Sequence, residues 1–196
     1  MCGIVSIGFK RIYLPFREAR ERGVRSSAFA LTRNSPVDDT TRPPRKEDLV
    51  KLCEELNRLG AKYIVIGGLA MNNLGLVRTT EDIDLLIDPS PENQHRIREA
   101  LLILPEKAIR ELGVDEDLQQ WIVTRVNDEI TVDLMTEACG VRYEEAKAEV
   151  QIREVQCVPI PMANRRLMIK LKQSRRPKDQ IDLQYLLQFD DQNDLG

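Results

Sequence analysis

The sequence is poor in the residues that build thiol clusters, disulfide frameworks and membrane spans. Its 196 residues include four cysteines and one histidine, and no pair of cysteines has the CxxC spacing of a zinc or redox site. Reduced thiols and a cytoplasmic location are therefore expected. The longest apolar run, 63–71, has nine residues even when its two glycines are counted, whereas a membrane-spanning helix needs about 20. We expect no membrane partner and no secretory leader.

Aromatic residues are also scarce, at 5% of the chain. Proteins that bind single strands by stacking bases on aromatic rings need more of them, and we expect no sequence-specific reading of DNA. Charged residues, by contrast, make up 31% and are unevenly distributed. Residues 1–46 have ten basic and four acidic side chains, a balance of +6, and the remaining 150 residues carry −9. A basic arm of this kind either binds nucleic acid or is merely solvated.

Turn-forming residues separate this arm from the rest of the chain. The stretch 34–44 (NSPVDDTTRPP) predicts a linker, and arginines interrupt the apolar groups before it, where only a short helix near 16–25 is expected. We therefore predict that residues 1–45 form a basic, poorly ordered extension. Residues 46–190 are expected to form one domain, and residues 191–196 a tail.

Apolar residues recur in the domain with the periods of helices and strands. Helices are predicted over residues 46–59, 69–74, 90–104, 106–112, 143–149, 163–172 and 178–189. Strands are predicted over residues 62–66, 82–88, 121–126, 129–135 and 152–160. This order predicts an α/β (α+β) fold in which helices flank a mixed β-sheet.

Two carboxylates share one face of a predicted strand. Because side chains at i and i+2 of a strand point to the same side, Asp82 and Asp84 project together while Ile83 faces the core. Asp133 likewise lies opposite the apolar residues of its own strand. If the two strands are neighbours, three carboxylates converge, and such a group repels itself unless a cation lies among the oxygens. Mg²⁺ takes carboxylate oxygens and keeps positions open for phosphates.

Two glycines, Gly67 and Gly68, follow the predicted strand 62–66 and precede a predicted helix. Glycine lets the backbone approach a ligand closely, and a helix N-terminus offers N–H groups to phosphate. Taken alone, a glycine pair after a strand is more often an ordinary turn. A phosphate cradle beside a carboxylate cluster, however, is the equipment for nucleotidyl transfer.

These motifs together resemble the nucleotidyltransferase superfamily of DNA polymerase β. The superfamily pattern is a GG or GS pair, a spaced hDxDh motif and a third acid on a separate strand. Here Gly67-Gly68 is followed after 13 residues by 82–85 (DIDL), and Asp133 is the later acid. Many members of the superfamily have serine after the first glycine, where this chain has Gly68.

Two further stretches narrow the resemblance. The segment 78–84 (RTTEDID) is similar to the R-x-T-x-D-I-D form of small bacterial members. These include the abortive-infection toxins of type IV toxin–antitoxin systems and the aminoglycoside or lincosamide nucleotidyltransferases. The segment 176–183 (RPKDQIDL), preceded by Lys170, resembles the C-terminal helix pair of the toxin-like group. The resemblance covers about residues 47–190 and implies a nucleotidyltransferase fold.

The resemblance also implies roles for individual residues. It implies two Mg²⁺ ions, or Mn²⁺ in their place, on three catalytic carboxylates: Asp82, Asp84 and Asp133. It implies a set of nucleotide-binding residues: Gly67, Gly68, Arg78, Lys170 and Lys178. For Lys178 an alternative stays open, because Lys178 and Asp182 are spaced as an i,i+4 pair that only stabilises a helix.

The implied activity is metal-dependent transfer of an NMP from an NTP to an acceptor hydroxyl. A toxin-like member acting on RNA, such as the 3′ end of tRNA, is favoured by the basic cluster at 165–178, and a toxin implies a cognate antitoxin. The acidic charge of residues 47–196 favours instead a small-molecule acceptor of the aminoglycoside or lincosamide kind. A further alternative is a member of the fold that binds nucleotide without turnover.

Overall fold

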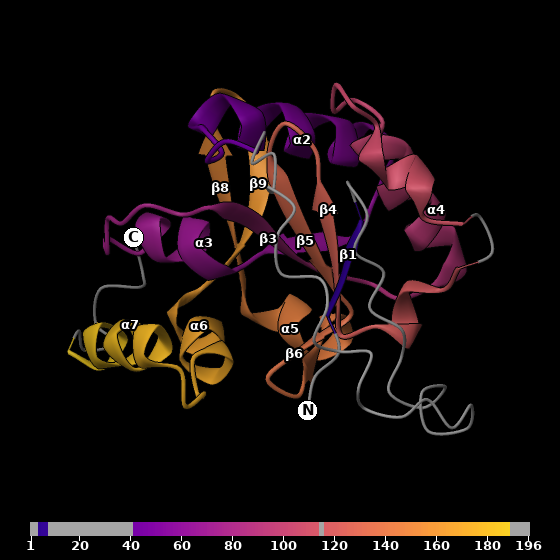
Figure 1. Cartoon of the computed structure of the whole chain (residues 1–196). Coiled ribbons are helices and arrows are strands. Elements are labelled where there is room, and N and C mark those ends of the chain that lie inside the picture. Colours follow the sequence, from indigo (N-terminus) through magenta and orange to yellow (C-terminus); the bar gives the residue numbers. More distant parts are fainter. Residues whose placement is uncertain (1–3, 8–40, 114–115, 189–196) are drawn as a thin grey trace, which may run out of the picture.

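The computed structural model describes residues 4–7, 41–113 and 116–188, which form a mixed sheet between two sets of helices (Figure 1). The described strands of this sheet are ordered β1-β4-β5-β3-β2-β9-β8. In chain order they are β1 (Ile4–Ile7), β2 (Tyr63–Val65), β3 (Asp82–Ile87), β4 (Val123–Asn127), β5 (Thr131–Met135), β8 (Val150–Val155) and β9 (Val158–Ala163). A two-stranded sheet is formed by β6 (Glu137–Ala138) and β7 (Val141–Arg142).

The helices follow the order predicted from the sequence. They are α2 (Lys46–Arg58), α3 (Gly67–Asn73), α4 (Pro91–Leu101), α5 (Tyr143–Ala146), α6 (Arg165–Leu171) and α7 (Pro177–Leu187). Short 3₁₀ turns cover η2 (Ala108–Glu111), η3 (Leu118–Gln120) and η4 (Lys147–Glu149). The predicted mixed sheet flanked by helices is thus confirmed.

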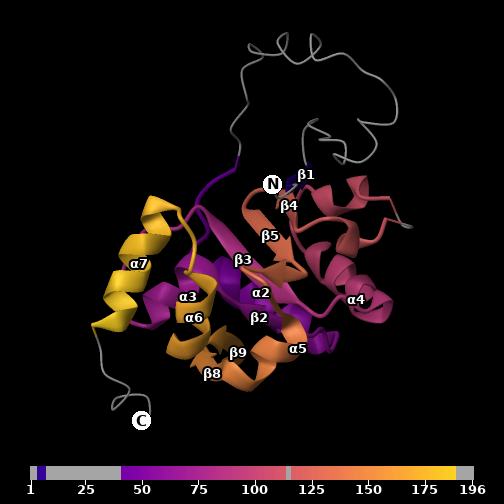
Figure 2. The same cartoon turned by 90° about the horizontal axis from the view of Figure 1, so that it is seen from below.

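The two faces of the sheet bury different helices. Tyr63 and Val65 of β2 pack in one apolar cluster with α2 and α4, whereas Ile64 of the same strand packs in a second cluster with α3, α6 and α7. This alternation is the period of two expected of a strand that is covered on both faces. Figures 1 and 2 show α6 and α7 side by side, on the side of the sheet where α3 lies.

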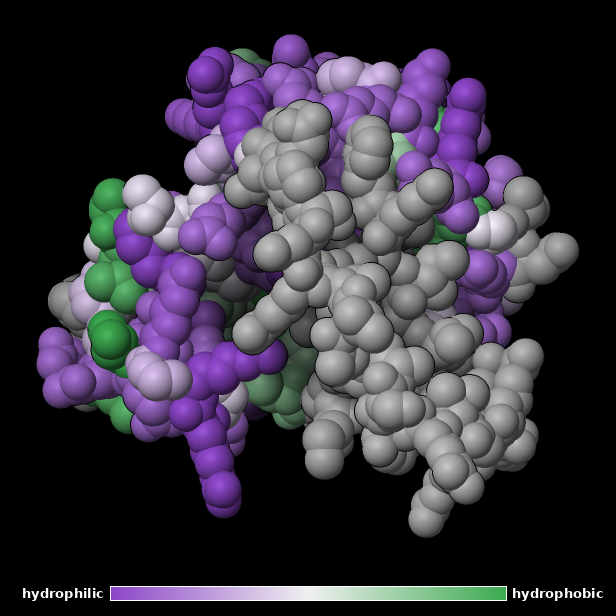
Figure 3. Space-filling model, in the orientation of Figure 1, coloured by the Kyte–Doolittle hydropathy of each residue, from purple (hydrophilic) through white to green (hydrophobic). Residues whose placement is uncertain are grey.

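Helix α2 illustrates how the sequence pattern produces this packing. Its buried residues Leu49, Leu52, Cys53 and Leu56 are three or four positions apart or adjacent, so they form one stripe. Hydrophilic residues cover its outer side at the top of Figure 3. The helix ends before Gly60, which has a φ of +65° and therefore favours glycine.

The structure corrects one predicted strand. Residues 152–160 were expected to form a single strand, but β8 and β9 form an antiparallel hairpin whose two-residue loop is Gln156-Cys157. Both loop residues have positive φ, 53° and 65°, as a type I′ turn requires. Asn-Gly is the usual signature of that turn, and Gln-Cys does not indicate it from sequence.

A second correction concerns the N-terminal extension. The segment Ile4–Ile7, which lies within the extension predicted to be poorly ordered, forms β1 and pairs in parallel with β4 at the edge of the sheet. The helix predicted near 16–25 and the tail predicted at 191–196 lie outside the described residues, so the domain boundaries stay a prediction. No helix in the described ranges is long and apolar enough to cross a bilayer.

Candidate active site

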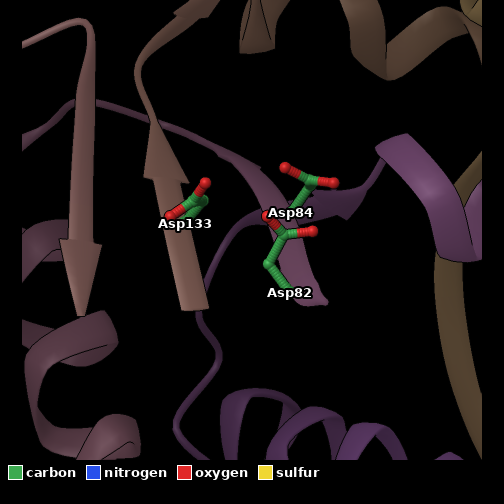
Figure 4. A group of neighbouring side chains, drawn as sticks. All are labelled: Asp82, Asp84 and Asp133. Atoms are coloured by element: carbon green, nitrogen blue, oxygen red, sulfur yellow. The ribbon is translucent and has the colours of Figure 1, made fainter. Parts of the chain in front are cut away.

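Three carboxylates meet on the face of the sheet that carries α3, α6 and α7. Asp84 of β3 is in register with Asp133 of the parallel neighbour β5. One oxygen from each of these residues and one from Asp82 all lie within 4.8 Å of one another. Figure 4 shows the three side chains rising from the two adjacent strands. The structure therefore brings together the three acids that the alternation of each strand had placed on its polar face.

The surroundings of Asp84 disfavour its charged form. Its burial, together with the charges of Asp82 and Asp133, raises the pKa of Asp84 to about 7, although Lys172 and the Gly68 N–H act in the opposite direction. Carboxylates forced together in this way favour a bound cation. Because all three donors are hard oxygens, the group fits Mg²⁺ or Mn²⁺ better than a soft metal ion.

The glycine turn between β2 and α3 lies directly against this cluster. Gly67 has a φ of +64°, and a Cβ at its position would lie 2.9 Å from Cβ of Asp84 and overlap the carboxylate. Gly68 donates its backbone N–H to Asp84. Glycine is therefore required at position 67 both by the backbone angle and by the close approach of Asp84.

This packing predicts a large effect for Gly67→Ala. A left-handed alanine alone costs about 1–2 kcal/mol, and the overlap must also displace Asp84, so both stability and metal binding should fall. Gly140→Ala is the matched control, since Gly140 has a φ of +79° and nothing within 4 Å of the added Cβ. Urea unfolding and titration calorimetry with Mn²⁺ would measure the two effects. Equal behaviour of the two variants in both measurements would contradict the proposed contact.

Thr80 explains why the second glycine is not serine here. A Cβ at position 68 would lie 2.6 Å from Oγ1 and 2.9 Å from Cβ of Thr80. Thr80 is itself buried and directs its hydroxyl to the backbone oxygen of Asp82, 3.1 Å away. The space that a serine side chain would need is thus filled by a residue of the β3 entry loop.

A buried ionic network lies beside the glycine turn. Asp182 of α7, 1% exposed, accepts a hydrogen bond of 3.1 Å from Nη2 of Arg78 and is 2.8 Å from Nζ of Lys172. Lys172 also bonds Asp179 at 2.9 Å. Burial alone would lower the pKa of Lys172, but these two carboxylates raise it above its ordinary value. Nε of Arg78 is buried without a hydrogen-bond partner among the described residues.

The two lysines named from the resemblance are outside this ionic network. Nζ of Lys170 is 3.5 Å from Glu149, with its side chain 53% exposed. Lys178 is exposed in the first turn of α7, and neither lysine forms an ion pair with the three carboxylates. Asp182 pairs with Arg78 and Lys172. Lys172, which the sequence indicates only as one member of a basic run, is the lysine whose charge lowers the pKa of Asp84.

Sequence reasoning also missed Arg125 of β4. Its Nε and Nη2 donate to the two oxygens of Asp133 at 2.8 and 2.7 Å, and Nη2 is 3.4 Å from Oδ2 of Asp82. The hydrogen bond to Asp133 raises the pKa of Arg125. The contact arises because Arg125 and Asp133 are opposite each other in the antiparallel pair β4–β5. Only the strand register, which no local motif reveals, could have indicated it.

A cleft of about 450 Å³ adjoins the carboxylate cluster on this side. Its lining combines the segment before α2 with the polar ends of β3, β4 and β5. The lining residues are Thr41, Arg42, Pro43, Glu81, Asp82, Arg125, Asn127 and Thr131. The cluster is therefore bordered both by the glycine turn and by this cleft.

Comparison with known families agrees with this geometry. Residues 52–195 match the family model described as nucleotidyl transferase AbiEii toxin, type IV TA system. The chain belongs to the AbiEii family. The resemblance to the toxin-like branch of the nucleotidyltransferases is thereby confirmed, and the matched region includes the glycine turn, all three carboxylates and the helix pair α6–α7. A search of curated proteins gives no match.

Proposed function

We propose that this AbiEii-family chain transfers an NMP from an NTP to an acceptor hydroxyl with the help of two Mg²⁺ ions. The observation that carries the proposal is the convergence of Asp82, Asp84 and Asp133 within 4.8 Å, directly beside the glycine turn. Those three residues would hold the ions, and Mn²⁺ is expected to replace Mg²⁺. When bound, the ions supply charge neutralisation on the phosphates and make the acceptor hydroxyl more acidic.

The residues of the chain divide the remaining work. Asp133 is proposed to accept the proton of the acceptor hydroxyl, whose oxygen forms the new bond to the α-phosphorus. The bond between that phosphorus and the bridging oxygen breaks, and pyrophosphate leaves with the electron pair. Asp82 and Asp84, fixed on β3, orient the reacting groups. Gly67 leaves room for the carboxylate of Asp84, and the Gly68 N–H holds that carboxylate in place beside the proposed phosphate site.

Cations on the glycine side are proposed to hold the triphosphate. Arg78 and Lys172 are the strongest candidates for binding the triphosphate. Both form ion pairs with Asp182, in the network beside the glycine turn, and Lys172 acts electrostatically on Asp84. The resemblance adds Lys170 and Lys178 as more exposed cations of the same site. An arginine is well suited to this task because its fork matches two phosphate oxygens at once.

An RNA acceptor, such as the 3′ end of tRNA, is proposed for a cytoplasmic toxin. Support comes from the family, which is described as a toxin of type IV TA systems, and from the basic residues at the C-terminal helix pair. A toxin of this kind implies a cognate antitoxin, so the neighbouring open reading frame is expected to encode a protein that relieves toxicity. Co-expression of the two frames would check this.

Release of pyrophosphate tests the reaction itself. The protein would be incubated with Mg²⁺, each NTP in turn and total RNA, and pyrophosphate would be measured with a coupled enzyme. We expect release that requires both RNA and the divalent ion. Metal binding by calorimetry without any pyrophosphate release would support a nucleotide-binding member of the fold instead.

A further inference from the structure

The two sides of the carboxylate cluster are chemically different. In the sheet, β2 lies on one side of β3, and β5 and then β4 lie on the other. The glycine turn follows β2, so the proposed triphosphate site is on the β2 side. The cleft is floored by Asn127 of β4 and Thr131 of β5, which are paired in register and joined by a hydrogen bond of 3.2 Å. The cleft thus lies across the cluster from the glycine turn.

Arg125 stands where the cluster and the cleft meet. It lines the cleft and at the same time makes two bonds to Asp133, which is 4% exposed. Its own side chain is 38% exposed. Asp82 and Asp133 would hold a divalent ion, yet both oxygens of Asp133 and one oxygen of Asp82 contact Arg125, and two cations repel each other. Arginine and metal ion therefore compete for these carboxylates.

We propose that the cleft is the acceptor subsite and that Arg125, once displaced from Asp133, binds the phosphate next to the reacting hydroxyl of the acceptor. The inference rests on the proposed function, since it assumes a transfer reaction at the cluster. A guanidinium fork that matches a carboxylate also matches a phosphate. Bonds from Arg125 to the acceptor phosphate would therefore replace the bonds that Arg125 loses when it is displaced from Asp133.

The rest of the cleft fits a nucleotide end. Asn127 and Thr131 offer amide and hydroxyl groups of the kind that bind ribose hydroxyls. Arg42 adds a second guanidinium, held by bonds of 2.6 Å and 2.9 Å to Asp48 and Glu129. The lining thus has two guanidinium groups that suit an anionic acceptor, beside the carboxylates of Glu81 and Asp82. Residues 41–43, which line one part of the cleft, precede the region 52–195 that the family model matches.

Equilibrium binding without turnover tests this subsite. A fluorescent six-nucleotide RNA would be titrated with full-length protein, Mg²⁺ and an α,β-methylene NTP, which fills the nucleotide site and blocks cleavage. A second RNA would carry a neutral methylphosphonate at its last linkage. We expect wild type to prefer the charged RNA about tenfold, because one charge-assisted fork is lost with the neutral one.

Two variants and one control decide the role of Arg125. Arg125→Gln is expected to lose the preference for the charged RNA and to bind Mn²⁺ about threefold more tightly in calorimetry, since a competing cation is gone. Asn127→Asp leaves Arg125 in place but adds a negative charge to the floor, so it should weaken binding of the charged RNA selectively. Arg110→Gln, an exposed arginine of η2, is expected to behave like wild type.

The outcomes separate this inference from the proposed function. If Arg125→Gln and Asn127→Asp both keep the wild-type preference for the charged linkage, the cleft is not the acceptor subsite, even where transfer to RNA is observed. If Arg125→Gln fails to fold, Asn127→Asp decides alone. If wild type shows the preference but transfers no nucleotide, the subsite stands and the proposed reaction is wrong.

Discussion

Asp84→Asn is expected to lower nucleotidyl transfer by about 10³-fold or more, while leaving the protein folded. A loss of this size corresponds to about 4 kcal/mol of transition-state stabilisation, which is within what a correctly placed metal ion contributes. The amide has the shape of the carboxylate but no charge for a cation. The same substitution should abolish Mn²⁺ binding in calorimetry, a measurement that does not depend on turnover.

The unfolding curve gives an independent check of the same residue. Because burial and the charges of Asp82 and Asp133 raise the pKa of Asp84, removing the charge of Asp84 should leave metal-free stability unchanged or slightly higher. Mg²⁺ should then raise the melting temperature of wild type but not that of Asp84→Asn. Glu99→Gln, at an exposed position of α4, is the control and should retain both activity and the Mg²⁺ response. An active Asp84→Asn protein would refute the assigned role.

Asp182→Asn is expected to reduce the free energy of unfolding by about 3 kcal/mol. Asp182 is 1% exposed and pairs with both Arg78 and Lys172, so its loss leaves Arg78 without its carboxylate partner and Lys172 with Asp179 alone. Breaking a buried ion pair by removing one partner costs about 3–5 kcal/mol, and the partial exposure of Arg78 places this case at the lower end. Urea denaturation followed by circular dichroism measures the change.

Lys178→Ala is the matched control for Asp182→Asn. Sequence spacing leaves open an i,i+4 pair between Lys178 and Asp182, but Asp182 is bonded to Arg78 and Lys172. We therefore expect Lys178→Ala to change stability by less than about 0.5 kcal/mol. A loss comparable with that of Asp182→Asn would show that the i,i+4 pair within α7, and not the network of Asp182 with Arg78 and Lys172, carries the stabilisation.

The part of the site that depends on local pattern could be predicted from the sequence. Alternation alone places Asp82 and Asp84 on the face opposite Ile83, because side chains of a strand alternate strictly. The structure agrees, since Ile83 is fully buried in the α2 and α4 cluster. The glycine pair is likewise visible in the sequence. The structure gives the reason for Gly67, because a Cβ there would overlap the carboxylate of Asp84.

The part of the structure that depends on strand register and on turn geometry could not be predicted from the sequence. Arg125 meets Asp133 only because β4 and β5 pair at those positions, and a shift of one residue would place it on the other face. Lys172, rather than Lys170, reaches Asp182 because it follows directly on the last residue of α6, where the chain turns toward α7. The β8–β9 hairpin was missed because Gln156-Cys157 lacks the usual turn residues.

The most direct test of the proposed reaction is transfer of label to RNA. Wild type and an Asp82→Ala/Asp84→Ala variant would each be incubated with Mg²⁺, total tRNA and one α-³²P-labelled NTP at a time, and the RNA would be separated on a denaturing gel. We predict label on RNA with wild type, for at least one NTP, and none with the variant. Absence of label on RNA with every NTP, from protein that binds Mn²⁺, would contradict the proposed reaction with an RNA acceptor.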